Sequence, residues 1–292
     1  MPVRGTRNAN VTTTAADTRL RTGRAAATGS KTKTAVPALL GDWKQAVLEA
    51  TAQDAAKQEL WPQVEKALAD AQKKKGTLLD DDEAEGVADA FYDKNEGKLE
   101  KLAAKHLTSF GTTAAKKDAV ITKVVDDARP RIATRRDPFT PVAQKDPQAR
   151  AREVVLWENK DAMVLVDLFV PRPKALVVPK TPVSFPTDAA PGVLDELARI
   201  AAHVSDAFMS ALPGAKDQPA GIWVNAPQHL TVKQLHVHVA PHAPAWTDIV
   251  GATGVGRARA MELTRDAQAR PAMNAIFKKL TAALEASLGP ST

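Results

Sequence analysis

The 292-residue chain contains no cysteine and no long apolar run. The absence of cysteine excludes disulfide bridges, thiolate nucleophiles and cysteine-ligated zinc, and it fits a reducing compartment. No stretch approaches the roughly 18 apolar residues that a membrane-spanning helix needs, and the first residues lack the apolar core of a secretory signal peptide. We therefore expect a cytoplasmic protein without a transmembrane segment.

Positive charge is concentrated at the start of the sequence. Residues 1–36 hold seven basic side chains and one acid, which accounts for the whole formal charge of +6, and the rest of the chain is balanced. This stretch has few large apolar residues, so burial cannot offset the entropy cost of ordering it. We predict a disordered basic tail over residues 1–36. A solvated leader is the simplest interpretation, and the alternative is a tail that attracts nucleic acid or an anionic membrane surface.

Apolar residues recur at helical spacing from Pro37 onward. One stripe includes Leu40, Trp43 and Val47, and a second begins at Leu60 and ends before a run of lysines and a glycine. We predict an α-helical domain over residues 37–130. The acids of DDDEAEG lack the alternate spacing of a calcium-binding loop and indicate instead the capped start of a helix.

The pattern changes after residue 130. Residues 131–150 are rich in proline and predict a linker. Short runs rich in β-branched residues then predict five strands, in the segments EVVLWEN, AMVLVDLFV, KALVVPK, AGIWVN and LTVKQLHVHVA. An amphipathic helix from Val193 to Phe208 separates the third strand from the fourth, and a last helix is predicted around Met273 to Leu284. This order predicts an antiparallel α+β domain over residues 151–292.

Three of the six histidines lie in the segment TVKQLHVHVAPH, residues 231–242. On a strand, alternation places Gln234, His236 and His238 on one face and the intervening apolar residues on the other. Imidazole acts as a nucleophile or proton donor near neutral pH. Two histidines on one face also suit zinc, with His229 or His242 as a further ligand. The segment has no carboxylate or cysteine, so we expect no metal.

The segment QLHVHVAP resembles the motif of the histidine-triad (HIT) superfamily of nucleotide hydrolases and transferases, which is His-x-His-x-His followed by two apolar residues. Upstream, LVDLFVPRPKALVVPK is similar to the family's aspartate, proline-containing turn and Val-Pro-Lys strand end, and GIWVNAP is similar to its asparagine-bearing strand. The resemblance covers about residues 153–246. It implies a HIT-like fold, a nucleotide-containing substrate and no cofactor, and it permits a homodimer.

Two positions depart from the common HIT pattern. Gln234 stands in place of the first triad histidine, and Lys174 stands where many members carry another histidine. The Gln-Leu-His-x-His form after an asparagine-containing loop is most similar to the CDP-diacylglycerol diphosphatase branch. That branch is usually membrane-anchored, whereas this sequence has no predicted span, so CDP-diacylglycerol and a soluble dinucleotide both remain as substrates.

The resemblance also implies roles for single residues. His236, in the middle position, would be the nucleophile that forms a nucleotidyl-histidine intermediate, and His238 would polarise phosphate oxygens. The other implied contacts are Gln234 and Asn225 with phosphate oxygens, Thr231 with the leaving group, Asp167 near the ribose, and Lys174 or Lys180 as sources of positive potential. The alternative is a catalytically inactive HIT fold that binds nucleotide or nucleic acid.

Overall fold

A computed structural model describes residues 34–168, 170, 172–215, 218–249 and 271–292. It divides into two compact units, which we call the helical unit, residues 48–121, and the sheet unit, residues 34–47 with the described residues from 122 onward. Residues 1–33 lie outside the described residues, so the disordered tail stays a prediction. Thr34 falls within that predicted tail, and its hydroxyl donates to Asp206 Oδ1 at 2.6 Å.

The helical unit is built from four helices, two of which also enter the sheet unit. They are α1 (Leu39–Lys75), α2 (Asp81–Lys94), α3 (Glu96–Ser109) and α4 (Ala114–Ala133). Ala56, Leu60 and Leu99 form a small core between α1 and α3. The two predicted apolar stripes lie on the single long helix α1. This helix continues through Pro62, because a proline inside a helix removes one backbone hydrogen bond without always ending the helix.

Both predicted ends in this unit are confirmed. Helix α1 ends at Lys75, and Gly76 follows with a φ of 78°, a left-handed conformation that glycine adopts without steric cost. Helix α2 begins with a capping box, in which the Asp80 carboxylate accepts from the Glu83 amide at 2.9 Å and Glu83 accepts from the Asp80 amide at 2.9 Å. The acids of DDDEAEG are thus the start of a helix.

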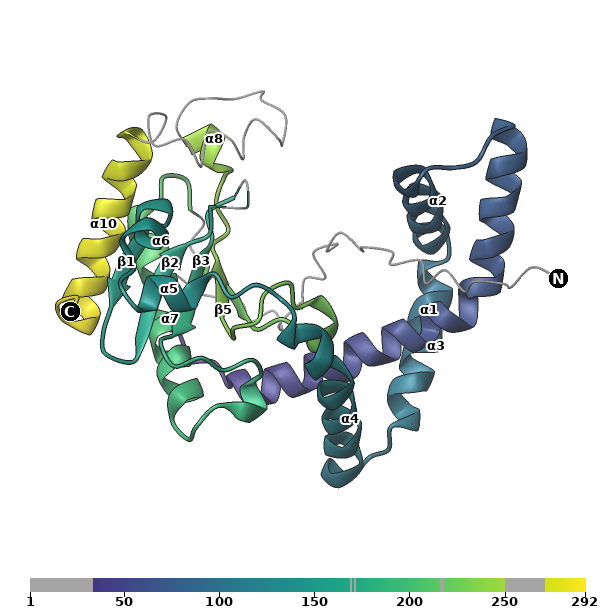
Figure 1. The fold of residues 1–292 in the computed structure, drawn as a ribbon, viewed down its shortest axis with the longest axis horizontal. Coiled ribbons are helices and arrows are strands. Elements are labelled where there is room, and N and C mark those ends of the chain that lie inside the picture. Colours follow the sequence, from purple (N-terminus) through teal and green to yellow (C-terminus); the bar gives the residue numbers. More distant parts are fainter. Residues whose placement is uncertain (1–33, 169, 171, 216–217, 250–270) are drawn as a thin grey trace. The chain divides into compact units, whose positions relative to one another are not determined.

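The sheet unit contains a five-stranded antiparallel sheet in the order β1-β2-β3-β5-β4. Four of these strands, β1, β2, β3 and β5, are labelled in Figure 1. The strands are β1 (Val155–Glu158), β2 (Ala162–Val166), β3 (Ala175–Pro179), β4 (Gly221–Trp223) and β5 (Val237–Ala240). The turn between β1 and β2 is closed by Asn159, whose side-chain oxygen accepts from the amides of Asp161 and Ala162. The predicted α+β class is confirmed.

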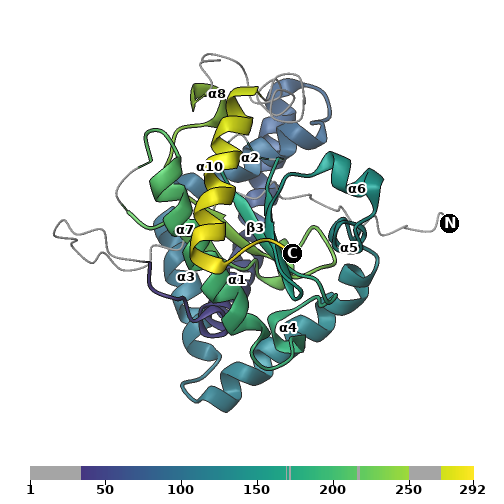
Figure 2. The same ribbon diagram turned by 90° about the vertical axis from the view of Figure 1, so that its left-hand side faces the viewer.

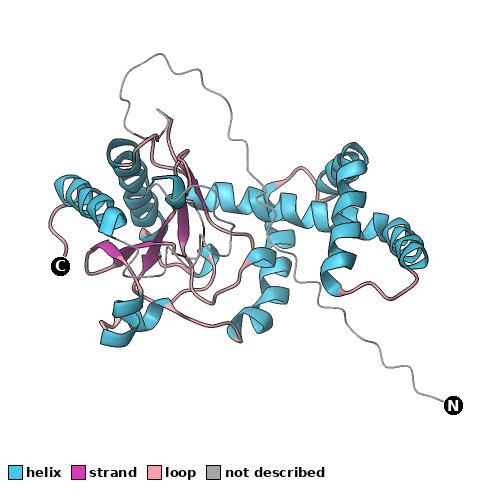
Figure 3. Ribbon diagram, turned by 90° about the horizontal axis from the view of Figure 1, so that it is seen from above, coloured by secondary structure: helices cyan, strands magenta, loops and turns pink. Residues whose placement is uncertain are grey.

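Helices cover both faces of this sheet. Helix α7 (Val193–Ala211) packs on β3 and β5, and α10 (Pro271–Leu288) packs on α7 and β1. Figure 2 shows α7 and α10 on one side, with the short helices α5 (Phe139–Ala143) and α6 (Pro147–Arg152) on the other, and Figure 3 shows the strands enclosed by helices. Among the described residues, the remaining short elements are α8 (Trp246–Ile249) and the 3-10 turns η1 (Pro186–Asp188) and η2 (Pro227–His229).

Residues 131–150, predicted to be a linker, contain α5 and the start of α6. Phe139 and Val142 of α5 are 7% and 1% exposed, and they form a core cluster with Met163, Leu165, Leu176 and Val178 of the sheet. A five-residue helix has little stability of its own, so this one depends on packing that a local sequence pattern does not reveal. The domain boundaries drawn from the sequence stay predictions.

Within the described residues no helix is both long and apolar enough to span a membrane.

Candidate active site

His236 directly precedes β5, and His238 is its second residue, where the strand is paired on both sides. His238 is opposite Leu176 of β3 and Trp223 of β4. Leu176 belongs to the cluster under α5, so His238 lies on the sheet face that α5 covers, while the neighbouring residues Val237 and Val239 are buried on the α7 side. The predicted alternation of histidine and valine across the two faces is therefore present.

The ring of His236 is held by its own chain. Nδ1 lies 2.9 Å from the backbone oxygen of Gln234, and since a carbonyl only accepts, Nδ1 carries the proton. Nε2 is then the nitrogen with the free electron pair. The side chain is only 6% exposed. Burial lowers the pKa of His236 below its ordinary 6.5; the Gln234 carbonyl and Asp167 oppose this shift, and Lys174 adds to it.

His238 differs from His236 in its hydrogen bonding. It is also 6% exposed, but neither of its ring nitrogens has a hydrogen-bond partner among the described residues. Burial lowers the pKa of His238 well below 6.5, and the neighbouring His236 and Lys174 lower it further. A buried polar group without a partner costs stability, so a retained one marks a candidate ligand contact.

Four rings form a row across this face of the sheet. Trp223 stacks on His238 with ring centroids 5.0 Å apart and an interplanar angle of 17°. His238 meets His236 at 4.6 Å, and His236 meets Phe139 at 5.4 Å, both in edge contacts. These contacts fix both imidazole planes. Phe139 and Trp223 were not identified from the sequence, although Trp223 lies two residues before Asn225 on the same strand pattern.

A buried ion pair lies beside the histidines. Lys174 Nζ is 2.8 Å from Asp167 Oδ2, and their side chains are 17% and 9% exposed. The backbone joins the same two residues, because the Asp167 amide donates to the Lys174 oxygen at 2.8 Å. Both charges act on the His236 ring, so the structure brings these two predicted residues to the histidines.

Gln234 is buried at 1% exposure, but it precedes β5 and does not continue the strand. Its amide nitrogen donates to the Pro179 backbone oxygen, and its amide oxygen accepts from the Thr140 hydroxyl at 3.3 Å. Strand β5 is therefore shorter than the predicted segment, because these contacts hold residue 234 outside the ladder. The predicted contact of Gln234 with phosphate stays a prediction.

The other predicted residues differ in their positions. Asn225 follows β4, and its side-chain oxygen accepts from Trp223 Nε1 at 3.1 Å. Thr231 is exposed in the loop between η2 and β5. Lys180 follows β3, but its ammonium group lies 2.6 Å from Glu158, which also binds Arg150. Lys180 thus belongs to a separate ion-pair cluster, and its predicted role in nucleotide binding is not tested by this arrangement.

The described part of the chain contains no group of three or more histidine, aspartate or glutamate side chains placed to hold a metal ion. His229 and His242, the two residues considered as further zinc ligands, are both exposed.

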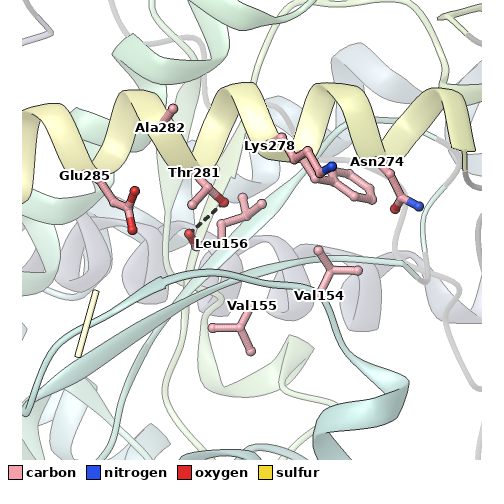
Figure 4. A pocket seen from close by; sticks show the side chains of 9 residues that line it. Val154, Val155, Leu156, Asn274, Lys278, Thr281, Ala282 and Glu285 are labelled. Carbon is pink, nitrogen blue, oxygen red and sulfur yellow. Dashed lines mark hydrogen bonds between the residues drawn. The ribbon is translucent and has the colours of Figure 1, made fainter. Parts of the chain in front are cut away.

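A separate pocket of about 390 Å³ lies between β1 and α10 (Figure 4). Apolar side chains of β1 face Lys278, Glu285 and Thr281 of α10, and the Thr281 hydroxyl donates to the Leu156 backbone oxygen at 2.9 Å. None of its lining residues was predicted as a site residue, so the histidine row remains the candidate active site.

No protein-family model matches the chain, and no curated protein matches it in sequence. Among solved structures, it is similar to a zinc-bound histidine triad family protein from Mycobacterium smegmatis, with 23% identity, a TM-score of 0.37, and coverage of 51% of this chain and 93% of that one. A hypothetical histidine triad nucleotide-binding protein from Sulfolobus tokodaii has 16% identity, a TM-score of 0.39 and coverage of 52% and 95%. A uridylyltransferase has 10% identity, a TM-score of 0.34 and coverage of 57% and 51%.

Proposed function

We propose that the protein is a HIT-type enzyme that cleaves a nucleotide-linked phosphoanhydride through an intermediate on His236. The observation that carries the proposal is the His236 ring, which is buried, neutral and oriented by the bond from Nδ1 to the Gln234 oxygen. This bond leaves Nε2 as the nucleophilic nitrogen without the need for a separate base. The QLHVHVAP motif provides independent support from the sequence.

The reaction has two displacements. In the first, the Nε2 electron pair forms a bond to the α-phosphorus, and the bond from phosphorus to the bridging oxygen breaks, so its electron pair leaves with the second phosphate group. In the second, a water oxygen attacks the same phosphorus, the N–P bond breaks, and its electron pair returns to Nε2. The water protons pass to the released nucleoside monophosphate and to solvent. Division into two steps lowers each barrier.

The neighbouring groups stabilise charge on the transferred phosphoryl group. His238 supplies a donor from its otherwise unpartnered ring, and Asn225 supplies its amide nitrogen, since Trp223 occupies its oxygen. Lys174 contributes positive potential. Its partner Asp167 neutralises this lysine in the free protein and binds the ribose when the nucleotide is present. Donors fixed in a buried site are effective because they need little reorganisation during the reaction. Thr231 contacts the leaving group, and Gln234 is a further implied phosphate contact. Lys180, whose ammonium group is bound to Glu158, adds at most positive potential.

The finer assignment concerns the substrate. The Gln234 form of the motif favours a CDP-diacylglycerol-like substrate, in which the leaving group is a phospholipid, and a soluble dinucleotide is the alternative. The two differ only beyond the bridging oxygen, so the histidine row serves both. Their discrimination depends on the leaving-group side, where Thr231 is exposed.

Release of nucleoside monophosphate from CDP-diacylglycerol and from a dinucleoside polyphosphate tests the proposal. We expect turnover of at least one substrate and a loss of at least about 1000-fold in His236→Ala, because the nucleophile is removed. The matched control is His106→Ala, which removes a histidine of the helical unit that binds Glu59. Wild-type turnover in His236→Ala contradicts the proposal.

A second candidate, a nucleotide-binding module without turnover, is favoured by one observation. The amide of Gln234 is already bonded to Pro179 and Thr140 in the free protein. This candidate predicts nucleotide binding by calorimetry without product release. If the basic residues 1–36 recruit nucleic acid to such a module, the affinity falls steeply with salt and on removal of the tail.

A further inference from the structure

The loop between β4 and β5, residues 224–236, connects several residues of the proposed site, and we call it the approach loop. It contains Asn225 near its start, then the turn η2, and then Gln234, whose backbone oxygen accepts the hydrogen bond from His236 Nδ1. A displacement of this loop therefore changes two things together: the position of Asn225 and the hydrogen bond that selects the His236 tautomer.

Two side chains from outside the sheet hold the backbone of the approach loop. Trp43, on the part of α1 that belongs to the sheet unit, donates from Nε1 to the backbone oxygen of Asn225 at 3.0 Å. Its side chain is only 2% exposed. Arg131, near the end of α4, donates from Nη2 to the Pro227 oxygen and from Nη1 to the Leu230 oxygen at 3.4 Å. Its guanidinium fork thus spans the 3-10 turn η2.

A third contact continues this attachment toward the histidines. The amide of Lys233 donates at 2.9 Å to the backbone oxygen of Arg136, in the loop that follows α4. The approach loop is therefore bonded to residues N-terminal to the sheet at its start, middle and end. Each bond uses a backbone group of the loop, so the side chains of Asn225 and Gln234 keep the orientations described above.

We infer that Trp43 and Arg131 are positioning residues, which fix the approach loop and through it the Asn225 amide and the Nδ1-protonated form of His236. The inference rests on the proposed function for its kinetic meaning. The effect on the His236 tautomer, in contrast, follows from the hydrogen bonds alone. The positioning role of Trp43 and Arg131 also explains why the first turns of α1 and the end of α4 belong to the sheet unit.

The test uses the full-length protein with Trp43→Phe and Arg131→Met, which remove the donors and keep most of the side-chain volume. Two matched controls exist in the sheet unit. Trp157→Phe removes another 2%-exposed indole that donates to a backbone oxygen, that of Gly289 at 2.9 Å. Arg129→Met removes an arginine of the same helix α4 that binds Asp188 and Asp126 instead of the loop.

Nitrogen-15 NMR of the histidine rings at pH 7.5 reports the tautomer directly. We expect His236 of the wild type and both controls to be protonated at Nδ1, and we expect a population protonated at Nε2 in Trp43→Phe and a larger one in Arg131→Met. Unchanged His236 signals in both loop variants overturn the inference, as do equal changes in the controls. If Arg131→Met does not fold, the conservative Trp43→Phe decides.

Kinetics provide the second readout. Misplacement of a reacting group by about 1 Å costs up to about 100-fold in rate, so we expect kcat to fall about 10-fold in Trp43→Phe and about 100-fold in Arg131→Met. KM stays within about twofold, since the direct substrate contacts of other elements remain. Wild-type kcat in both variants overturns the inference. If the wild type itself has no turnover, the proposed function fails and the NMR result alone decides the positioning role.

Discussion

At the scale of single residues, His236, just before β5, and His238, within it, are equally buried but chemically different. His236 has one nitrogen bonded to the Gln234 oxygen, whereas His238 has two nitrogens without a partner among the described residues. Backbone hydrogen bonding thus determines which ring presents a defined electron pair. Burial keeps both rings neutral at physiological pH.

The lowered pKa of His236 predicts the pH dependence of the reaction. Only the neutral ring is a nucleophile, and burial moves its protonation below the ordinary 6.5. We therefore expect kcat/KM to be constant from about pH 8 to about pH 6.5 and to decrease only at lower pH. A pH series with the active substrate measures this. A half-maximal point at or above pH 6.5 would show that the ring is not desolvated as described.

The unpartnered ring of His238 predicts an opposition between stability and activity. In His238→Phe the ring stack on Trp223 remains and two unpaired polar atoms are removed, which relieves a cost of about 1–3 kcal/mol. We expect a free energy of unfolding at or above that of wild type and a loss of about 100-fold in kcat. Denaturant unfolding and product release measure the two effects.

The comparison variant is His238→Ala, which leaves a cavity in the ring row and should be about 2 kcal/mol less stable than His238→Phe. If His238→Phe is as destabilised as His238→Ala, the nitrogens of His238 have partners that stabilise the fold, and the interpretation as a ligand contact is wrong.

At the scale of elements, an ion-pair cluster joins β1, the end of β3 and α6. The carboxylate of Glu158 is 7% exposed, accepts two bonds of 2.8 Å from Arg150, and lies 2.6 Å from Lys180 Nζ. Arg150 is the main cause that lowers the pKa of Glu158 to about 2, with Lys180 contributing and burial opposing. The cluster fixes α6, and with it the neighbouring α5 that carries Phe139.

Glu158→Gln should therefore destabilise the protein in a pH-dependent way. At pH 7 it leaves two cations without their partner, and we expect a loss of about 3 kcal/mol. Because the folded pKa is depressed, the contribution of Glu158 is complete above its unfolded value of 4.5 and is lost as the pH falls toward 2. Unfolding free energies at pH 7 and pH 3 measure the difference between wild type and variant.

The control for this change is Asp127→Asn, which removes an exposed i,i+4 pair with Lys123 on α4. Such pairs contribute about 0.3–0.5 kcal/mol. A loss in Glu158→Gln as small as that in the control, or one that is as large at pH 3 as at pH 7, would contradict the structural role of the cluster.

Some elements of the sheet unit are predicted well from sequence patterns, and others are not. Strands β1 to β4 and helices α7 and α10 follow from alternation or helical spacing, since their buried faces have a clear period. Helix α5 does not, because two apolar residues among prolines become a core element only against the finished sheet. Glu158 falls in the predicted strand segment EVVLWEN, but its ion pairs are not predicted, because its partner Lys180 is distant in sequence and an ion pair leaves no periodic pattern.

For the candidate site, the sequence predicts several residues but not the contacts that orient them. The pair His236 and His238 and the neighbouring Asp167 and Lys174 follow from a strand pattern and a motif. The hydrogen bond that orients His236, the engagement of Gln234 by Pro179, and the stack of Trp223 on His238 required the three-dimensional arrangement. Two of these contacts, Gln234 with Pro179 and Trp223 with His238, join residues distant in sequence, which local spacing does not encode. The bond from His236 to the Gln234 oxygen is local, but it depends on the backbone conformation just before β5.

At the scale of the whole molecule, the chain combines a helical unit with a sheet unit that contains every residue of the proposed site. The sheet unit also includes the first turns of α1 and the end of α4, which contact the approach loop through Trp43 and Arg131. The proposed site is therefore contacted by segments that begin well before residues 153–246, whose sequence resembles the HIT superfamily. The proposed reaction depends on one covalent step at His236.

The most direct measurement is the intact mass of the protein after a brief incubation with CDP-diacylglycerol or a dinucleoside polyphosphate, followed by an alkaline quench that preserves a phosphorus–nitrogen bond. The account predicts a nucleotidyl adduct in the wild type, located on His236, and no adduct in His236→Ala. Product release by the wild type with no adduct on His236, or an equal adduct in His236→Ala, would contradict the account.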